Sequence, residues 1–282
     1  MTEDLRTIQV GAATVTIINV GDVQEDLNNW FALSEAERAH HADLLAKPAR
    51  LPIQCIHIAM PGVSVLVDAG LYDYPPDAPQ LIPGYQPPLD LFAGLAQRQI
   101  KLDEIQQVII THAHGDHFDA ESLAAIAGSA PLVVTEEVMG KLPEALKAQA
   151  TMLKNGDSGT IDGIPVTAVP AYNITPDRLD KHPQGVGNGY VLSFGDKRVY
   201  VAGDTEDTPE MRALTGIDVA FLPMNLPYTM DVEQAADAVK AFKPKIVYPY
   251  HYRSSDIEKF KELVGAAAEV RLVDWYANAA GG

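Results

Sequence analysis

Four side chains able to bind a metal ion follow one short apolar stretch near the middle of the chain. Residues 108–110 (Val-Ile-Ile) have the β-branched composition of a buried strand, and the pattern HxHxDH follows at His112, His114, Asp116 and His117. On an extended chain, residues two positions apart point the same way, so His112 and His114 can direct their imidazoles at one point. Gly115 permits a sharp turn, after which the aspartate and the last histidine can face a neighbouring point. This set predicts a transition-metal site, zinc above all, with one or two ions.

Three further stretches accompany this motif. They are Val-Asp-Ala-Gly at 67–70, Ala-Gly-Asp-Thr at 202–205 and Pro-Tyr-His-Tyr at 249–252. Together with HxHxDH they resemble the signature of the metallo-β-lactamase-fold hydrolases, over roughly residues 15–272. The downstream half is similar to the branch that includes the ascorbate-6-phosphate lactonase-like proteins and the N-acylphosphatidylethanolamine phospholipases.

The resemblance implies a dinuclear site with five histidines and a bridging aspartate. The implied ligands are His112 and His114 with a third histidine at the first metal, Asp116, His117 and His251 at the second, and Asp204 between them. In relatives the third histidine follows a strand that corresponds to residues 166–171, where this chain has Tyr172 and Asn173. We expect His182, the only histidine between the motif and position 251, in that place; the alternative is Asn173 as a weak ligand. The resemblance also implies that Asp68 supports the metal loop through hydrogen bonds without binding metal.

These ligands predict hydrolysis by a metal-bound hydroxide. Zinc lowers the pKa of bound water to about 7, so hydroxide is available at neutral pH to attack a carbonyl or phosphorus centre. Asp116 is expected to orient that water or carry its proton. Tyr228 is expected to donate a hydrogen bond to the substrate, although an ordinary packed tyrosine explains it equally well. The basic residues best placed to meet an acidic substrate group are Arg178, Lys181 and Arg253, with solvated surface charge as the default interpretation.

The favoured function is a metal-dependent hydrolase whose expected substrate is a small ester or lactone, including one with an acidic group. One alternative is a phosphodiesterase, as in the phospholipase relatives. Another is a metal-holding binding or regulatory protein with little turnover, which the missing histidine after Ala171 keeps open. Two zinc ions are expected, with manganese or iron as the other candidates. A di-iron redox site is disfavoured because flavodiiron relatives resemble HxExDH, with glutamate in place of His114.

Composition narrows the class of protein. The chain has 282 residues, with 21 basic and 38 acidic side chains and a formal charge of −17, which disfavours general nucleic-acid binding. Its one cysteine, Cys55, excludes an internal disulfide and fits a reducing compartment. The first residues lack the pattern of a secretory signal, and no apolar run approaches the ~18 residues of a membrane helix. We therefore expect a cytoplasmic protein that acts on a small molecule, with no integral membrane segment and with homo-oligomerisation left open.

The elements that must position these residues form two groups of strands, each followed by helices. Strands are predicted at 7–10, 13–20, 53–58, 64–67, 108–110, 131–135, 165–171, 190–194, 198–202, 219–222 and 246–250. Helices are predicted at 34–46, 89–98, 119–127, 136–150 with an interruption near Pro143, 232–242, and after a capping box at 255–258. This pattern suits a single α/β domain over 1–282, and the resemblance implies an αββα sandwich of two mixed β-sheets flanked by helices. Residues 27–46 and 71–88 are the candidate wall of a substrate pocket, with a plain surface excursion nearly as good an interpretation.

Overall fold

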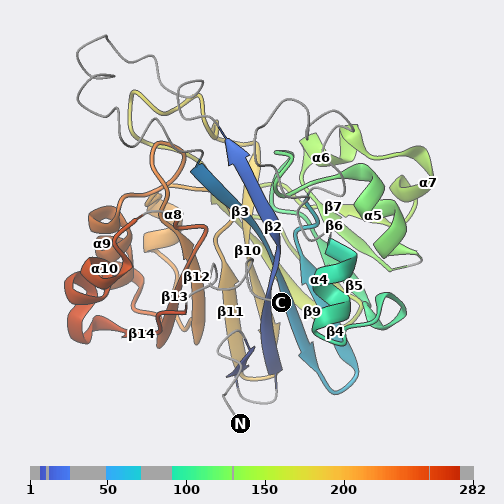
Figure 1. The fold of residues 1–282 in the computed structure, drawn as a ribbon, viewed down its shortest axis with the longest axis horizontal. Helices are drawn as coiled ribbons and strands as arrows, with labels where there is room; N and C mark the ends of the chain where they lie inside the picture. Colours follow the sequence, from blue (N-terminus) through green and yellow to red (C-terminus); the bar gives the residue numbers. More distant parts are fainter. Residues whose placement is uncertain are drawn as a thin grey trace.

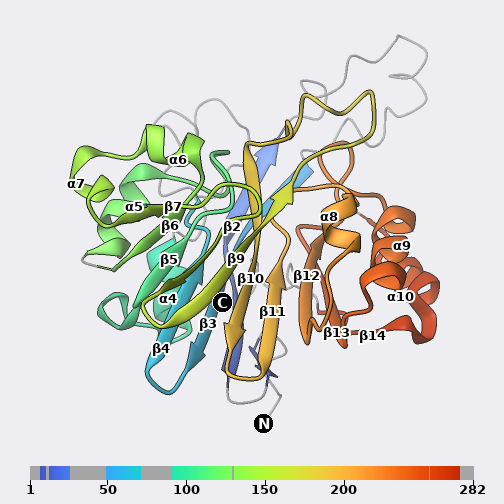
Figure 2. The same cartoon turned by 180° about the vertical axis from the view of Figure 1, so that it is seen from behind.

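Two mixed β-sheets lie between two layers of helices (Figures 1 and 2). The structure, a computed structural model, describes residues 7–10, 13–25, 49–70, 91–128, 130–253 and 255–273. Within these residues the first sheet has the spatial order β1 (Thr7–Val10), β2 (Ala13–Glu25), β3 (Ala49–Met60), β4 (Val63–Val67), β5 (Gln107–Ile109), β6 (Leu132–Val134) and β7 (Ala150–Met152). The second has the order β14 (Glu269–Val270), β13 (Ile246–Tyr250), β12 (Val219–Pro223), β11 (Lys197–Val201), β10 (Gly187–Phe194), β9 (Ile164–Ala171) and β8 (Ser158–Ile161).

Each sheet is antiparallel in its first half along the chain and parallel in its second. The antiparallel pairs run from β1 to β4 and from β8 to β11, and the parallel pairs from β4 to β7 and from β11 to β14. Strands β9, β11 and β13 therefore end at the same edge of the second sheet, and β4 and β5 end at the same edge of the first. Loops after such strand ends are where a rigid sheet can hold a functional site.

Helices cover the outer side of each sheet (Figure 1). The first sheet carries α4 (Leu91–Gln97), α5 (Ala120–Ala127), α6 (Glu136–Lys141) and α7 (Glu144–Lys147). The second carries α8 (Pro209–Arg212), α9 (Val232–Phe242) and α10 (Ile257–Val264). Short 3-10 turns lie at Leu102–Glu104 and Gly265–Ala267. Among the described residues, every helix falls short of the length and apolar character needed to cross a membrane.

Alternating side chains of the strands form two cores. In β4, Val65 and Val67 face the core between the sheets, whereas Leu66 faces the core beneath the helices. In the stretch that precedes the metal-ligand motif, Ile109 faces the second sheet and Val108 faces the helices. Because both faces of this central strand are covered, its apolar residues are continuous in sequence instead of alternating with polar ones.

The structure confirms the predicted fold class and most of the predicted elements, with a few corrections. The predicted 136–150 helix is split into α6 and α7, and β7 begins at Ala150. Strand β10 begins at Gly187, three residues before the prediction, because glycine gives little strand signal and the pairing with Ala171 comes from the sheet. Asp256, and not Ser255, caps α10, since its side chain accepts a hydrogen bond from Lys259 N. The predicted 34–46 helix and the proposed pocket walls, 27–46 and 71–88, lie outside the described residues.

One buried histidine in the first sheet gives a pH-dependent stability. His57 on β3 is 5% exposed, and its Nε2 lies 2.9 Å from Ser64 Oγ. Burial lowers the pKa of His57 from 6.5 to about 4. The unfolded chain therefore binds more protons than the folded one between these values, so stability present above pH 6.5 is lost as the pH falls toward 4.

We expect the substitution His57→Gln to flatten this dependence. Between pH 7.5 and pH 5 the wild type should lose about 2 kcal/mol more unfolding free energy than the variant, as the pKa difference requires. Urea unfolding of both proteins at the two pH values measures this difference. Equal losses in the two proteins would show that His57 does not carry the effect.

Candidate metal centre

The HxHxDH motif forms a tight loop between β5 and α5. The backbone N–H groups of His117 and Phe118 both donate to the carbonyl oxygen of His114, at 3.0 and 2.8 Å. Asp119 then caps α5 by accepting a hydrogen bond from Ser122 N at 2.7 Å. The strand before the loop and the helix after it therefore fix both of its ends.

Asp68, directly after β4, holds this loop from the neighbouring strand. Its carboxylate accepts hydrogen bonds from Thr111 N at 2.8 Å and from Thr111 Oγ1 at 3.0 Å, and it lies 2.8 Å from His117 Nδ1. The backbone adds to this frame, because Ala69 N donates to His117 O at 2.9 Å. These contacts give Asp68 the supporting position that the resemblance implied.

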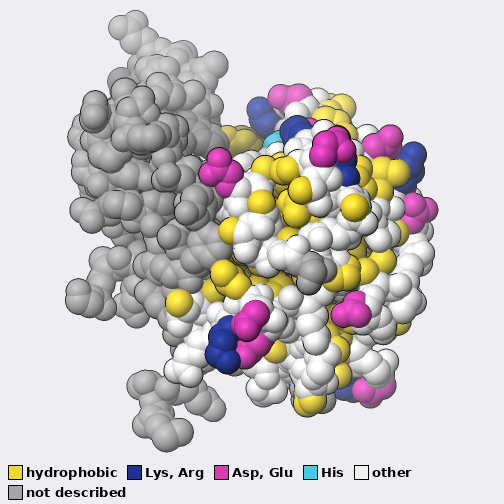
Figure 3. Space-filling model, turned by 90° about the vertical axis from the view of Figure 1, so that its right-hand side faces the viewer, with side chains coloured by type: hydrophobic (Ala, Val, Ile, Leu, Met, Phe, Trp, Pro, Cys, Tyr) yellow, Lys and Arg dark blue, Asp and Glu magenta, His cyan; other side chains and the backbone are white. Residues whose placement is uncertain are grey.

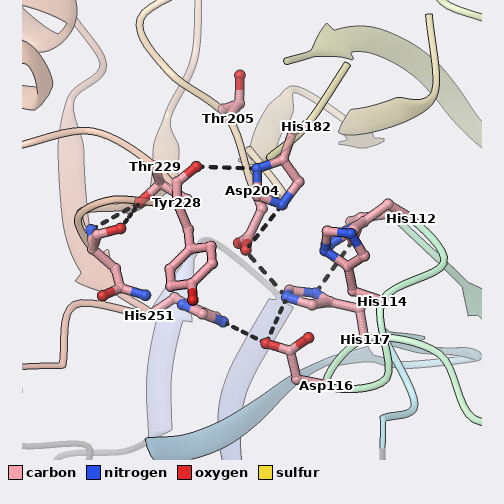
Figure 4. Close-up of polar contacts among 12 residues, drawn as sticks. His112, His114, Asp116, His117, His182, Asp204, Thr205, Tyr228, Thr229 and His251 are labelled. Atoms are coloured by element: carbon pink, nitrogen blue, oxygen red, sulfur yellow. Dashed lines mark hydrogen bonds and ion pairs between the residues drawn. The ribbon is translucent and has the colours of Figure 1, made fainter. Parts of the chain in front are cut away.

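His112, His114 and His182 form one group of potential ligands (Figure 4). The ring of His182 lies 5.2 Å from that of His112 and 4.9 Å from that of His114, measured between centroids. The facing atoms His112 Nε2 and His114 Nδ1 are 3.1 Å apart. His112 and His182 are buried, and His114 is exposed. The group is therefore open to solvent on the side of His114.

His182 reaches this group from the long connection between β9 and β10, residues 172–186. Asn173 N donates to His182 O at 2.9 Å, so the connection folds back on itself. The Asn173 side chain lies behind the imidazole, with its Oδ1 3.2 Å from His182 Nδ1 and its Nδ2 donating to Tyr228 O at 3.0 Å. Of the two candidates weighed from the sequence, the structure thus places His182 with the other histidines and Asn173 on the far side of its ring.

Asp116, His117, Asp204 and His251 form the second group. His251 Nε2 and His117 Nε2 lie 3.2 and 3.7 Å from Asp116 Oδ2. The His117 and His251 rings are stacked at a centroid distance of 5.3 Å. His251 comes directly after β13, at the edge where β11 also ends. Residues from both sheets therefore meet in this group.

Asp204 lies between the two groups. Its Oδ1 is 3.6 Å from His117 Nε2 and its Oδ2 is 3.6 Å from His182 Nε2 (Figure 4). The helix that follows is capped not by Asp204 but by Thr208, whose Oγ1 accepts a hydrogen bond from Met211 N at the start of α8. Each carboxylate oxygen of Asp204 thus faces a different group.

Hydrogen bonds behind the rings orient three of the imidazoles. His117 Nδ1 contacts the Asp68 carboxylate, and His182 Nδ1 lies 3.0 Å from the carbonyl oxygen of Tyr228. Because both partners can only accept, each Nδ1 carries a proton, and each Nε2 is the ring atom directed at the centre. His112 follows the same arrangement, since its Nδ1 lies 3.1 Å from Thr111 Oγ1, whose hydroxyl donates to Asp68. Such outer partners commonly orient metal ligands.

The spacing of the facing atoms fits a divalent metal ion. Tetrahedral ligands with bonds of about 2.0–2.1 Å to zinc stand about 3.3 Å from one another. The separations described above run from 3.1 to 3.7 Å. Moreover, His117 Nε2, His182 Nε2 and Asp204 Oδ1 are buried without a hydrogen-bond partner, which is costly unless another group satisfies them. The donor set and its unsatisfied atoms thus match what a metal ion requires.

The electrostatics of the centre also favour a cation. Burial alone would lower the pKa of His117, but the carboxylates of Asp116, Asp204 and Asp68 outweigh it and raise that pKa to about 10. Burial alone would raise the pKa of Asp204. His251 and the other surrounding imidazoles lower it by more, so the net shift is downward and the carboxylate stays ionised. At the other group, burial lowers the pKa of His112 well below its usual value, so this imidazole is neutral. Metal ligation requires neutral imidazoles and ionised carboxylates, so a metal ion would take the place of the proton that the three carboxylates hold on His117.

The tyrosine and the basic residues predicted to meet the substrate lie at different distances from the two groups of ligands. Tyr228 lies in the loop between β12 and α9, where its carbonyl contacts His182 and its ring lies 5.4 Å from Arg253 Cζ. Arg178 is turned inward, with Nη2 2.6 Å from Glu206 Oε1. Lys181 lies 3.2 Å from Asp180 Oδ2 and lines a cavity.

This cavity, of about 300 Å³, opens beside the first group. Its lining consists of His112, His114, Glu137, Asp180, Lys181, His182, Pro183, Val186 and Gly187. Its volume is at the lower end of the range for small-molecule sites. The cavity therefore gives a small ligand access to the first group of histidines.

Several residues that support the centre were not predicted in that role. Gln54, buried on β3, accepts a hydrogen bond from His251 N at 2.9 Å and so joins the two sheets at the site. Thr111 links Asp68 to His112, and Glu206 contacts the connection that carries His182. The threonine at 111 belongs to the motif, although its supporting role was not predicted, and no periodicity or motif distinguishes Gln54 or Glu206 from ordinary polar residues.

Comparison with known proteins agrees with this geometry. Residues 64–252 match the model of the beta-lactamase superfamily domain. A UPF0173 metal-dependent hydrolase of Pyrococcus horikoshii is 38% identical over 188 residues, which cover 63% of this chain and 82% of the relative. A similar UPF0173 hydrolase of Pyrococcus abyssi is 37% identical over 177 residues, 59% of this chain and 77% of the relative.

Solved structures agree as well. A metal-dependent hydrolase from Parabacteroides distasonis superposes with a TM-score of 0.62 at 34% identity, covering 80% of this chain and 93% of the other. The metallo-beta-lactamase fold protein YhfI from Bacillus subtilis, at 12% identity, shares the fold with a TM-score of 0.57 over 92% of this chain and 95% of its own. The chain therefore belongs to the beta-lactamase superfamily and, within it, to the UPF0173 metal-dependent hydrolases.

Proposed function

We propose that this hydrolase binds two zinc ions and cleaves a small ester or lactone. The observation that carries the proposal is the position of Asp204, whose two oxygens each lie 3.6 Å from a histidine of a different group. A carboxylate placed in this way is suited to bridge two ions. Nitrogen and carboxylate donors, with no cysteine in either group, also suit manganese or iron, so zinc is the first of three candidates.

Under this proposal, one ion would be held by His112, His114 and His182 and the other by Asp116, His117 and His251, with Asp204 available to both. Bound there, divalent ions supply water of lowered pKa and polarise a substrate oxygen. Asp116 uses Oδ2 toward His251 and His117, which leaves Oδ1 to orient the attacking water and hold its proton. Tyr228 is assigned to donate a hydrogen bond to the substrate through its hydroxyl, because the backbone carbonyl of this residue contacts His182 and so places the residue at the edge of the centre.

The cavity supports a small substrate with an acidic group. Glu137 on its wall pairs with Lys141 at 2.8 Å, so the charge of this carboxylate is compensated. Lys181 on the same wall pairs with Asp180 at 3.2 Å, and because Asp180 is exposed, solvent screens this pair and leaves the ammonium group open to exchange its partner. An acidic group on the substrate would meet Lys181 while the bond to be cleaved lies near the histidines.

The proposal extends to the location and organisation of the chain. We assign the chain to the cytoplasm as one domain, with homo-oligomerisation open.

A nucleic-acid substrate is disfavoured, because on the face shown in Figure 3 acidic side chains accompany the basic ones. On and beside α6 and α7, Lys141, Lys147 and Lys154 each form an ion pair with a glutamate. Such paired lysines leave little net positive charge for phosphates.

A substrate panel tests the proposed reaction. The zinc-loaded protein should open homoserine or sugar lactones, and His114→Ala should abolish turnover while the protein stays folded. Cleavage of bis(p-nitrophenyl) phosphate in place of lactones would instead establish the phosphodiesterase alternative. Retained metal without turnover of either substrate would favour a binding or regulatory protein. Turnover that survives verified removal of the metal would contradict the metal mechanism altogether.

A further inference from the structure

A buried ion pair joins the segments around His182. Glu206 follows Asp204 by two positions, and its side chain is 0% exposed. Arg178, at 12% exposure, places Nη2 2.6 Å from Glu206 Oε1. Burying two charges costs free energy unless further hydrogen bonds complete the pair. The partners of these two side chains therefore indicate what the pair holds in place.

Glu206 fixes the start of the 172–186 connection. Its Oε2 accepts hydrogen bonds from Ile174 N and Thr175 N, each at 2.7 Å. Its own backbone N–H donates to Tyr172 O at 3.0 Å. The segment that follows Asp204 is thereby tied to the connection that carries His182.

Arg178 fixes the same connection to the loop between β12 and α9. Its Nη1 donates to Thr229 O at 2.9 Å, and its Nη2 donates to Thr175 Oγ1 at 2.8 Å. The neighbouring carbonyl, Tyr228 O, is the one that receives His182 Nδ1. Arg178 thus sets the position of the 172–186 connection relative to the Tyr228 carbonyl, which orients the imidazole of His182.

We propose that Glu206 and Arg178 are positioning residues that place His182 at the first metal. This inference rests on the proposed two-ion function. His112 is oriented separately by Thr111, and His117 by Asp68, neither of which belongs to the 172–186 connection. Loss of the ion pair should therefore weaken the ion held by His112, His114 and His182 and leave the ion at Asp116, His117 and His251 in place.

The substitution Arg178→Met tests this, with Arg212→Met as a matched control. Arg212 also pairs with a buried carboxylate, that of Asp207, at 2.8 Å from Nε to Oδ1, but Arg212 is 44% exposed and the pair lies within the 207–212 segment. After dialysis of the zinc-loaded proteins against a graded zinc chelator, Arg178→Met should keep one zinc at wild-type affinity and hold the other about 10–100-fold more weakly, the usual effect of losing a residue behind a metal ligand. Arg212→Met should keep both zincs at wild-type affinity.

Two further variants guard against loss of folding. Glu206→Gln keeps the side-chain shape, and Arg178→Lys keeps the charge while giving up the forked contacts; both should weaken the same single zinc. Two zincs at unchanged affinity in folded Arg178→Met, or equal weakening of both zincs, would overturn the positioning role. A wild type that binds no more than one zinc would instead refute the proposed two-ion function, so the two failures are distinguishable.

Discussion

Replacing Asp204 with asparagine should reduce hydrolysis by roughly a thousandfold, because a catalytic metal ion contributes several kcal/mol to transition-state stabilisation. Asp204 is buried, and its two oxygens face His117 and His182 at 3.6 Å. An amide offers one oxygen and no negative charge, so it cannot compensate two cations. Initial rates on the best lactone of the panel, with zinc content measured on the same samples, provide the test.

Asp207→Asn is the matched control for this prediction. Asp207 is also buried, lies three residues away and pairs with Arg212. Its substitution should change stability but leave zinc content and turnover within a few-fold of the wild type. If Asp204→Asn keeps two zincs and near wild-type rates, the Asp204 carboxylate is not needed to bind the two metal ions.

Alanine at Gly70 should displace the metal loop. A Cβ at this position would lie 2.9 Å from His117 N and closer still to the carbonyl of Asp116, both of which are backbone groups. Overpacking of this kind costs about 1–3 kcal/mol of unfolding free energy. Because a shift of about 1 Å in a catalytic group can cost about a hundredfold in rate, turnover should fall by at least that factor. Urea unfolding and initial rates measure the two effects.

Gly140→Ala controls for the loss of a glycine. Gly140 lies in α6, and an added Cβ would meet no atom within 4 Å. Alanine is preferred over glycine inside a helix by about 1 kcal/mol, so this variant should be as stable as the wild type or more so, with unchanged turnover. Wild-type activity in Gly70→Ala would mean that the loop tolerates displacement and that its close fit against residue 70 is unimportant.

Much of the centre could be predicted because the sequence next to each ligand indicates the strand end at which that ligand lies. The HxHxDH residues follow an unmistakable strand, and Asp204 and His251 follow strands whose parallel order brings their ends to one edge. His182 was harder to place, because it lies in an irregular connection whose path depends on Glu206, Arg178 and the carbonyl of Tyr228. No local pattern encodes such a path.

The contacts between the two sheets could not be predicted for a similar reason. Gln54 accepts a hydrogen bond from His251, 197 residues away, and its sequence context differs little from that of any polar residue on a strand. The short strands β7 and β14 were also missed, since two or three residues at a sheet edge carry almost no periodicity. Pairing with a neighbouring strand, and not intrinsic propensity, makes these residues extended.

Zinc content per chain, wild type against His182→Ala, tests the central claim most directly. The proteins are purified without chelator, loaded with zinc, dialysed and analysed for metal, with folding checked by circular dichroism. The two-ion account predicts two zincs in the wild type and about one in the variant, because His182 completes the group formed with His112 and His114. Equal zinc content in the two proteins would contradict the account and leave the position of His182 without a role in metal binding.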